Sequence, residues 1–425
     1  MNSPSEKAKI YALCDVNNFY VSCERLFRPD LQNKPVIVLS NNDGCIISIS
    51  DEAKAAGIKM AIPYHEAKEI IEQHKITTFS SNYGLYGDIS QRFNWVLEQY
   101  CDQVSAYSVD ESFLMFEGYE SNLYERAINI RKELLRTLSL PTCIGLAPTK
   151  TLAKVANHYA KRHKTSTQGV VDLCSPQQRQ WILKQIPIQN VWGIGRQLSK
   201  KLMTYRIHTA WDLHNADYKT LQRLFSVNME RTILELRGQP CLSFNQLAQP
   251  KKSILNSRSF AKRITEYSDL REALSYHATR CCEKLRKQGS LASSISMFLY
   301  ARKHNKDYLY RPNLTITLPE ATDDTSIFLQ AIDKGLKQIY LSGEHYKKAG
   351  VMLNGIVTRE GYQSDFFNHI QQRPELMQKL DLINQRFGKD SVKFASLGFS
   401  KNWAMRANHY SGNYVGSWHD ILRLK

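Results

Sequence analysis

Two short apolar segments that each carry carboxylates are the strongest constraint on how this chain folds. Residues 13–20 (LCDVNNFY) place Asp15 directly after an apolar run, and residues 107–112 (YSVDES) carry the adjacent pair Asp110 and Glu111. Apolar runs of this length predict strands. Because an unpaired charge on a buried strand is costly, these strands indicate a bound cation. Hard oxygen ligands suit Mg²⁺, and two such ions can clamp the attacking and leaving oxygens of a phosphoryl transfer.

The three carboxylates are the candidate catalytic residues and metal ligands. We predict that Asp15 and Asp110 bridge two Mg²⁺ ions and that Glu111 is a further ligand of the ion nearest the attacking hydroxyl. The backbone carbonyl of Val16 is predicted as an additional ligand. Any one of these acidic residues is more often a solvated turn or cap residue. Their combination on two strands, 95 residues apart in the chain, favours a single site.

The residues next to the first carboxylate suit a nucleotide. Residues 17–20 begin a predicted helix whose backbone N–H groups can hold a triphosphate. Phe19 and Tyr20 lie here, and Tyr20 is far enough from Asp15 to lie under the sugar, where an aromatic ring collides with a 2′-OH and selects deoxyribose. Lysines commonly bind phosphates, and the candidates are Lys54, Lys150 and Lys154. Taken singly, the tyrosine is more often a core residue and each lysine part of a solvated helix face.

The positive charge of the chain lies in its later part. The net charge is +17, but residues 1–173 hold 19 basic and 20 acidic residues, whereas the rest of the chain holds 38 basic and 20 acidic ones. A neutral part followed by a strongly basic part indicates a polyanionic partner, most simply a nucleic acid. The alternative is a basic surface that serves only solubility.

Features of secreted and membrane proteins are missing from the sequence. The N-terminus is polar, and no run of about 18 uncharged apolar residues occurs. Nine cysteines, none of them spaced as CxxC, fit neither a zinc site nor a disulfide framework. We therefore expect a cytoplasmic protein.

Two groups of residues are candidates for contact with DNA. Residues 191–196 (VWGIGR) lie between two predicted helices, where Gly193 and Gly195 would let backbone N–H groups approach a DNA phosphate. The alternative is an ordinary packing corner. The basic residues that follow this motif are Arg196, Lys200 and Lys201. A second basic group suits the phosphates of a duplex, and it comprises Lys251, Lys252, Arg258, Lys262 and Arg263.

A short segment near the C-terminus is a candidate docking peptide. Residues 363–367 (QSDFF) combine Gln363 with two aromatic residues, Phe366 and Phe367, in a polar stretch. A peptide of this kind can insert into an apolar pocket of another protein. Matches of five residues also occur by chance.

The order of predicted elements indicates an α+β fold in several domains. A chain of 425 residues is too long for one ordinary domain. Its first part alternates short strands with helices, which predicts a sheet covered by helices. Residues 175–238 predict small helices and residues 254–358 a second α+β domain, whereas residues 359–425 predict an irregular tail.

Seven segments together resemble the Y-family translesion DNA polymerases. They are DVNNFYVSCE (15–24), PVIVLSNNDGCIIS (35–48), EAKAAGIKM (52–60), FSSNYGLYGDIS (79–90), YSVDES (107–112), GLAPTKTLAK (145–154) and VWGIGRQLSKKL (191–202). The resemblance implies a right-hand polymerase. Its implied parts are a palm (1–20 and 85–173), small fingers (21–84), a helix–hairpin–helix thumb (174–241), a linker (242–253), a DNA-binding α+β little finger (254–358) and an irregular C-terminal tail (359–425) with a clamp-binding peptide (363–367).

The resemblance also implies an activity and partners. The activity is error-prone, template-directed addition of deoxynucleotides across damaged DNA in the SOS response, with two Mg²⁺ ions and no proofreading. The implied partners are primer–template DNA, deoxynucleoside triphosphates, a UmuD′-like dimer, a RecA filament and the beta sliding clamp, in the cytoplasm and at the nucleoid when active. The family's metal ligands match Asp15, Asp110 and Glu111, its steric gate matches Tyr20, and its triphosphate contacts match Lys54 and Lys154. Many members carry an aromatic residue where this chain has Asp51, to which we assign no role.

Two other function classes compete with a polymerase. A nucleotide cyclase also uses paired carboxylates on a palm-like sheet, but it needs neither the glycine-containing motif nor the later basic domain. A non-catalytic DNA-binding regulator has no use for three converging carboxylates. Primer extension on a damaged template separates the three.

Overall fold

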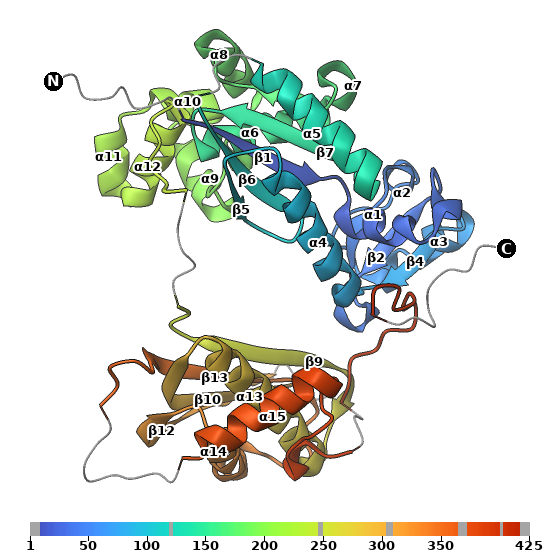
Figure 1. The fold of residues 1–425 in the computed structure, drawn as a ribbon, viewed down its shortest axis with the longest axis vertical. Helices are drawn as coiled ribbons and strands as arrows, with labels where there is room; N and C mark the ends of the chain where they lie inside the picture. The colour runs from blue at the N-terminus through green and yellow to red at the C-terminus, as the bar shows by residue number, and fades with distance from the viewer. Residues whose placement is uncertain are drawn as a thin grey trace. The chain divides into compact units, whose positions relative to one another are not determined.

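The chain forms two compact units in this computed structural model. The structure describes residues 9–118, 122–244, 250–302, 309–363, 372–399 and 403–416. The first unit comprises Met1–Leu247 together with Asn408–Lys425, and the second comprises Ala248–Ala407 (Figure 1). Of the predicted docking peptide, Gln363 is exposed, whereas Phe366 and Phe367 lie outside the described residues.

A five-stranded sheet carries the predicted carboxylates. Its strand order is β5-β6-β1-β7-β8, and the central strand β1 (Lys9–Val16) pairs antiparallel with β6 (Glu111–Glu117) and with β7 (Thr142–Ala147). The edges are β5 (Gln103–Ala106) and β8 (Val170–Asp172). The strands expected around both carboxylate segments are confirmed, and Asp110 lies in the turn between β5 and β6.

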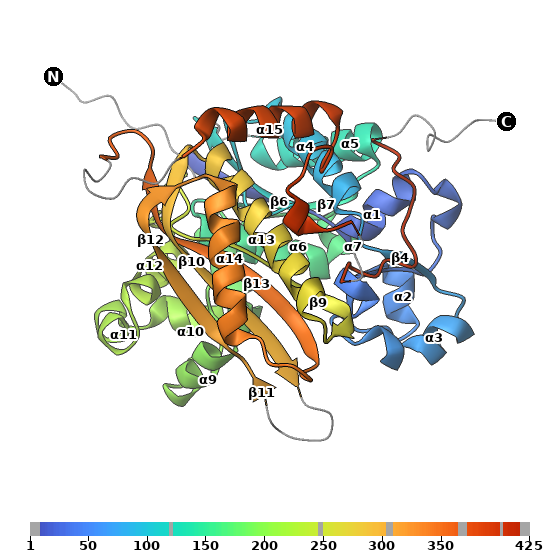
Figure 2. The ribbon, with the colours of Figure 1, turned by 90° about the horizontal axis from the view of Figure 1, so that it is seen from below.

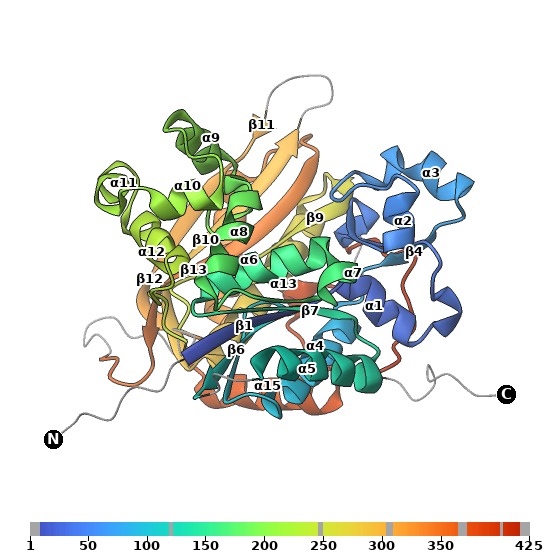
Figure 3. The same ribbon diagram turned by 90° about the horizontal axis from the view of Figure 1, so that it is seen from above.

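Helices cover both faces of this sheet (Figure 3). Side chains alternate along β1, so Tyr11 and Leu13 pack toward α6 (Lys150–Arg162). The short helix α7 (Lys164–Thr167) follows α6 in the chain. The intervening residues of β1 pack toward the opposite core with α4 (Tyr83–Glu98) and α5 (Leu123–Leu138). By the same alternation Asp15 lies on the face that α6 covers.

A smaller mixed sheet follows β1 in the chain. Its strand order is β3-β2-β4, with β2 parallel to β4 and antiparallel to β3. The strands are β2 (Val36–Leu39), β3 (Ile46–Ile49) and β4 (Thr77–Ser80), and the helices beside them are α1 (Phe19–Leu26), α2 (Asp51–Ala55) and α3 (Lys68–Gln73), with short 3-10 turns at Pro29–Leu31, Asn41–Asp43 and Tyr64–Glu66. This sheet has an apolar core of its own.

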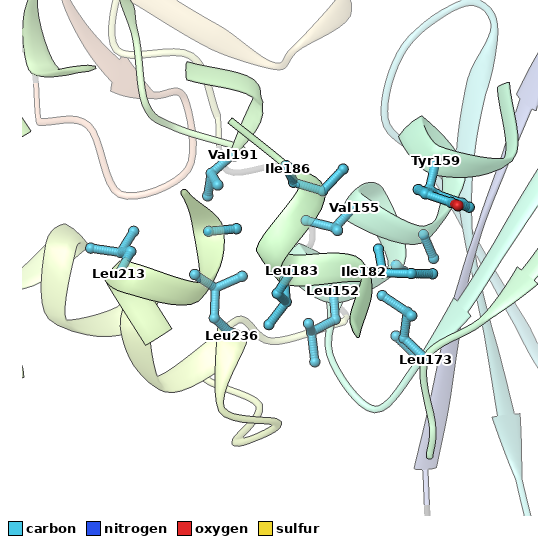
Figure 4. Packing of buried hydrophobic residues seen from close by; sticks show 14 of the residues in the cluster. Leu152, Val155, Tyr159, Leu173, Ile182, Leu183, Ile186, Val191, Leu213 and Leu236 are labelled. Carbon is cyan, nitrogen blue, oxygen red and sulfur yellow. The ribbon is translucent and has the colours of Figure 1, made fainter. Parts of the chain in front are cut away.

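Five short helices form the next part of the first unit, and a 3-10 turn at Ile188–Asn190 lies between the first two. They are α8 (Pro176–Gln185), α9 (Arg196–Thr204), α10 (Ala210–Asn215), α11 (Tyr218–Leu224) and α12 (Val227–Leu236). Their apolar side chains pack in one continuous core with α6, as Figure 4 shows for Leu152, Ile182 and Leu236. Helix α6 is therefore packed between the sheet and these short helices.

The second unit is an α+β domain. Its antiparallel sheet has the order β11-β10-β13-β9, with β12 paired to β10. The helices α13 (Tyr267–Lys287) and α14 (Thr325–Ile339) pack against one another and against the sheet (Figure 2). The strands are β9 (Ile254–Ile264), β10 (Ser290–Arg302), β11 (Leu309–Tyr310), β12 (Asn313–Thr322) and β13 (Tyr346–Thr358). The predicted α+β fold is confirmed.

The prediction of an irregular tail is wrong in part. Pro374–Phe387 form the helix α15, with a proline in its first turn and Met377 fully buried, and Ala395–Leu397 form a 3-10 turn. A proline at the start of a helix and an apolar face that packs on the rest of the unit both favour this helix. From Asn408 onward the chain belongs to the first unit again.

Candidate active site

Asp15 and Glu111 lie directly opposite one another on neighbouring strands. They form the last pair in the register between β1 and β6. Asp15 is 1% exposed, and Glu111 is partly buried. Like charges in opposed positions repel each other, so positive charge is needed at this end of β1 and β6.

Two lysines of α6 supply positive charge to this pair. Lys154 Nζ lies 2.9 Å from Glu111 Oε2, and Lys161 Nζ lies 2.5 Å from Asp15 Oδ1. The two lysines are seven residues apart, which places them on one face of the helix, two turns apart. Lys154 is predicted from the sequence as a triphosphate contact and not as a partner of Glu111, and Lys161 was missed. Its spacing from Lys154 was the available signal.

The pKa values of the two carboxyls shift in opposite directions. Burial raises the pKa of Asp15 well above its usual range, although Lys161 opposes the shift. Burial also acts to raise the pKa of Glu111, but the hydrogen bond with Asp15 and the Lys154 ammonium outweigh it and lower the pKa. Burial thus opposes the charged form of this pair and the lysines favour it, and a bound divalent cation would favour the charged form further. Such a pair of oxygen donors suits Mg²⁺.

Asp110 is adjacent to this pair through the backbone. Its carbonyl accepts a hydrogen bond from the Val16 N–H at 2.9 Å. Its carboxylate accepts the Ser108 hydroxyl at 2.6 Å, so the side chain is held within its own turn. Within the described ranges, no three acidic, histidine or cysteine side chains converge as a ready-made metal cluster. The donors nevertheless fit a cation, because Asp15 and Glu111 already converge and the backbones of Val16 and Asp110 adjoin them.

Tyr20 forms an aromatic wall with two tyrosines of α4. Its ring stacks on Tyr86 with 4.3 Å between centroids, and Tyr83 meets it edge-on at 6.2 Å. Tyr20 is partly exposed, as a ring that contacts a sugar must be. Phe19 differs, because it is 3% exposed and packs in the core below the wall. The Phe19 side chain therefore belongs to the core, and the contact of the backbone N–H groups of residues 17–20 with a triphosphate stays a prediction.

A buried carboxyl supports this wall from behind. Glu24 is fully buried, and its Oε1 accepts hydrogen bonds from the Tyr86 hydroxyl at 2.7 Å and from the Ser411 hydroxyl at 3.2 Å. Burial raises the pKa of Glu24 to about 7, and the two hydrogen bonds oppose the shift. The wall thus rests on a network whose charge changes near neutral pH.

The raised pKa of Glu24 predicts that the free energy of unfolding depends on pH. The unfolded chain releases this proton near the ordinary value of 4.5, whereas the folded chain retains it up to a pKa of about 7. The free energy of unfolding is therefore expected to fall between these pH values, by about 3 kcal/mol for this group. Glu24→Gln removes the titration and is expected to remove this loss, measured by urea unfolding at about pH 5 and about pH 8.

The matched control is Glu125→Gln, at an exposed position of α5. It is expected to retain the pH dependence of the wild type. The same pH dependence in wild type and Glu24→Gln would contradict the assignment to Glu24.

Lys54 takes part in a cluster around Asp51. Lys54 Nζ lies 2.8 Å from Asp51 Oδ1 and donates to Asn18 Oδ1 at 2.8 Å, and Lys164 Nζ lies 3.1 Å from Asp51 Oδ2. Burial acts to raise the pKa of Asp51, but these hydrogen bonds outweigh it and lower the pKa. The carboxylate pairs with both ammonium groups, so Asp51 and a bound triphosphate would compete for Lys54. The sequence did not predict Lys164.

Lys150, predicted as a phosphate-binding residue, has its ammonium on partners other than Asp15 and Glu111, and its contact with phosphate stays a prediction. Its side chain is mostly buried, and its ammonium donates to the Ser243 carbonyl at 2.9 Å. The ammonium also lies over the rings of Phe113 and Phe244. Position on the helix decides this outcome, because Lys150 begins α6 at the end away from Lys161.

The glycine-containing motif lies beside a large cavity. Gly193 has a φ of +83°, a backbone conformation that favours glycine, and Gly195 is the N-cap of α9. The cavity has a volume of about 900 Å³ and includes Gly193 and Lys201 in its lining. The predicted Gly193, Gly195, Arg196, Lys200 and Lys201 are all exposed. They are therefore accessible to a polyanion.

The predicted basic residues of the second unit lie at and before its edge strand β9. Lys251, Lys252, Lys262 and Arg263 are exposed, and Arg258 is partly exposed. A small cavity on the same unit is lined by further basic side chains, Arg311, Lys347 and Lys348. In the part of the chain that the structure describes, no helix is long and apolar enough to cross a membrane.

The fold is that of the Y-family DNA polymerases. A chimera of the Y-family polymerases Dbh and Dpo4 superimposes with a TM-score of 0.63 at 18% identity, covering 82% of this chain and 99% of that one. An insertion ternary complex of Dbh DNA polymerase gives a TM-score of 0.53 with the same coverage. These likenesses establish the architecture.

The chain belongs to the impB/mucB/samB family. The family model matches residues 14–158, its C-terminal domain matches residues 251–366, and a domain of unknown function matches residues 374–424. The chain is 41% identical to UmuC of Salmonella typhimurium strain LT2 over 98% of this chain and 100% of that protein. It is 39% identical to MucB of Escherichia coli over 97% and 99%, and 26% identical to DNA polymerase IV 1 of Bacillus subtilis strain 168 over 91% and 92%.

Proposed function

We propose that Asp15, Asp110 and Glu111 hold two Mg²⁺ ions and that this site adds deoxynucleotides to a primer opposite damaged template bases. The chain is an error-prone translesion DNA polymerase, a DNA-directed DNA polymerase of the Y-family type. The observation that supports this site is the opposed pair Asp15 and Glu111, with Lys154 and Lys161 beside it. When bound, the ions would stabilise the charge on the attacking and leaving oxygens.

The protein's own residues position the nucleotide for this reaction. Lys154 and Lys161 are suited to receive phosphate oxygens, because each now neutralises a carboxylate that a cation would take over. Lys54 and Lys164 can hold the far end of the triphosphate once Asp51 releases them. Tyr20 closes the space under the sugar and excludes a 2′-OH.

We assign the domains of the polymerase to the observed elements. The five-stranded sheet with α4, α5 and α6 is the palm, and the three-stranded sheet with α2 and α3 forms the fingers. Helices α8–α12 form the thumb, and the β9–β13 domain is the little finger. The exposed basic residues of the thumb and little finger would bind the phosphates of the primer–template duplex without reading its sequence.

Primer extension past an abasic site tests the proposal. The purified chain, with Mg²⁺ and all four deoxynucleoside triphosphates, is expected to extend a primer across the lesion, and omission of Mg²⁺ is expected to abolish extension. A second arm adds a sliding clamp and an activated RecA-type filament. Lack of extension in both arms would contradict the proposal. Conversion of a nucleotide to its cyclic form, without use of the primer, would support the cyclase alternative.

We also propose the partners and the location of this activity. A UmuD′-like dimer, a RecA filament and the beta sliding clamp are the proposed protein partners, with Gln363, Phe366 and Phe367 as the clamp contacts. This chain has Ser364 and Phe366 where such peptides usually carry leucines, which predicts weak clamp binding. The proposed location is the cytoplasm, at the nucleoid during synthesis.

Binding to DNA is expected to depend steeply on salt. If the chain neutralises about five phosphates, its affinity for a primer–template falls on the order of 10²- to 10³-fold between about 50 and about 200 mM NaCl. Fluorescence anisotropy measures this slope. Replacing Lys262 and Arg263, both exposed on β9, by alanine is expected to reduce the slope by about two. A flat salt response would contradict the basic DNA-binding surface.

A further inference from the structure

The last part of the described chain lies against the three-stranded sheet. We call residues 408–415 the C-terminal strap, and in Figures 1 to 3 it is the red segment beside β4. The Ser80 N–H donates to the His409 carbonyl at 2.9 Å, and the Asn408 N–H donates to Asp43 Oδ2 at 2.8 Å. The strap thus uses the backbone at the end of β4. It falls within the match to the domain of unknown function.

The strap binds the residue that caps α4. Asn82 is 2% exposed, and its side-chain oxygen accepts the Leu85 N–H, which caps the helix. The same oxygen accepts the Tyr410 hydroxyl at 2.9 Å, and the amide nitrogen donates to Ser411 Oγ at 3.0 Å. Asn82 and Ser411 are both buried, so leaving their polar groups unpaired would be costly. The strap therefore fixes the first turn of α4.

The strap also binds α1. The Ser411 hydroxyl, 7% exposed, donates to Glu24 Oε1 at 3.2 Å. The Tyr414 ring stacks on Phe27, directly after α1, with 4.6 Å between centroids and 9° between planes. Tyr414 and Val415 pack against the buried core that includes both helices. One short segment therefore joins the end of α1 to the start of α4.

These two helices carry the aromatic wall. Tyr20 lies on α1 one turn before Glu24, and Tyr86 lies on α4 one turn after Asn82. Tyr20 and Tyr86 stack on one another, and the Tyr86 hydroxyl donates to Glu24. A shift of either helix would move one ring against the other. The strap holds the C-terminal end of α1 and the N-terminal end of α4.

We propose that the C-terminal strap positions Tyr20, the residue that excludes a 2′-OH. By joining α1 to α4 the strap sets where the Tyr20 ring lies and so increases the discrimination against ribonucleotides. The inference rests on the proposed function, because it concerns the same nucleotide site. It assigns to a segment of the domain of unknown function a role in substrate selection. Ser411 and Tyr414 are positioning residues, since they act through Glu24, Asn82 and Phe27.

The test compares full-length variants in single-nucleotide insertion. Ser411→Ala combined with Tyr414→Ala is expected to lower the ratio of kcat/KM for deoxy- over ribonucleotides about tenfold, mostly through better ribonucleotide use. Tyr414→Phe keeps the ring that stacks on Phe27 and is expected to retain the wild-type ratio. If the double variant does not fold, Ser411→Ala alone replaces it, with a smaller decrease in the same direction.

A Tyr20→Ala background decides whether the strap acts through the gate. There the strap substitutions are expected to change the ratio no further, because the ring that they position is gone. An unchanged ratio in the strap variant, or an equal decrease with and without Tyr20, would overturn the proposal. Wild-type primer extension in the same assay tests the polymerase function separately, so failure of the strap proposal leaves that function standing.

Discussion

Asp110→Ala is expected to abolish nucleotide addition while leaving DNA binding intact. The Asp110 carboxylate is one of the three proposed cation ligands. Loss of a ligand at a two-ion site weakens the stabilisation of the negative charge that develops in the transition state. We expect the rate of primer extension to fall by at least about 10³-fold. Asp110 is partly exposed and lies in a turn, so the fold is expected to survive. Substitution of Asp15 would test the site less directly, because Asp15 is 1% exposed and paired with Lys161, so its loss would also affect stability.

The matched control is Glu133→Ala, a carboxylate that pairs with Arg136 on the same helix, α5. It is expected to extend primers as the wild type does. Fluorescence anisotropy with primer–template DNA should give similar Kd values for all three proteins. Extension by Asp110→Ala at the wild-type rate would remove Asp110 from the active site.

Tyr20→Ala is expected to admit ribonucleotides. The Tyr20 ring is held flat against Tyr86 at 4.3 Å, so it cannot easily turn away from a 2′-OH. Its removal opens the space under the sugar, and we expect the preference for deoxynucleotides to fall about 10²-fold, equal to about 2.7 kcal/mol. Steady-state insertion of matched deoxy- and ribonucleotides measures the ratio.

Tyr20→Phe is the control for this substitution. It keeps the ring and removes only the hydroxyl, so the preference is expected to stay near the wild-type value. The same ratio in Tyr20→Ala and in wild type would mean that another group selects the sugar.

Much of the site follows from periodicity in the sequence. Alternation along β1 and β6 places Asp15 and Glu111 on one face, and the register makes them opposite. The same kind of reasoning, applied to α6, would have found Lys161, seven residues after Lys154. Lys150 lies at the other end of that helix and bonds to Ser243, so its surroundings differ from those of Lys154 and Lys161.

Long-range contacts were beyond such reasoning. The bond between Asn82 and Ser411 joins residues 329 positions apart, and that between Asp51 and Lys164 joins residues 113 apart. Local patterns report which face of an element is apolar, but they carry no information on which distant segment covers it. The helix α15 shows the reverse case, because its proline start and apolar face were present in the sequence.

By itself the sequence determined the α+β class, the strands with their carboxylates, the aromatic residue beside them and the basic later part. These depend on short-range periodicity and composition, which need no partner segment to be recognised. Only the tertiary structure decided that Asp51 holds Lys54 and Lys164, and that the chain end binds beside β4. Those outcomes depend on packing between segments remote in the chain, where small differences in burial and hydrogen bonding select one partner among several.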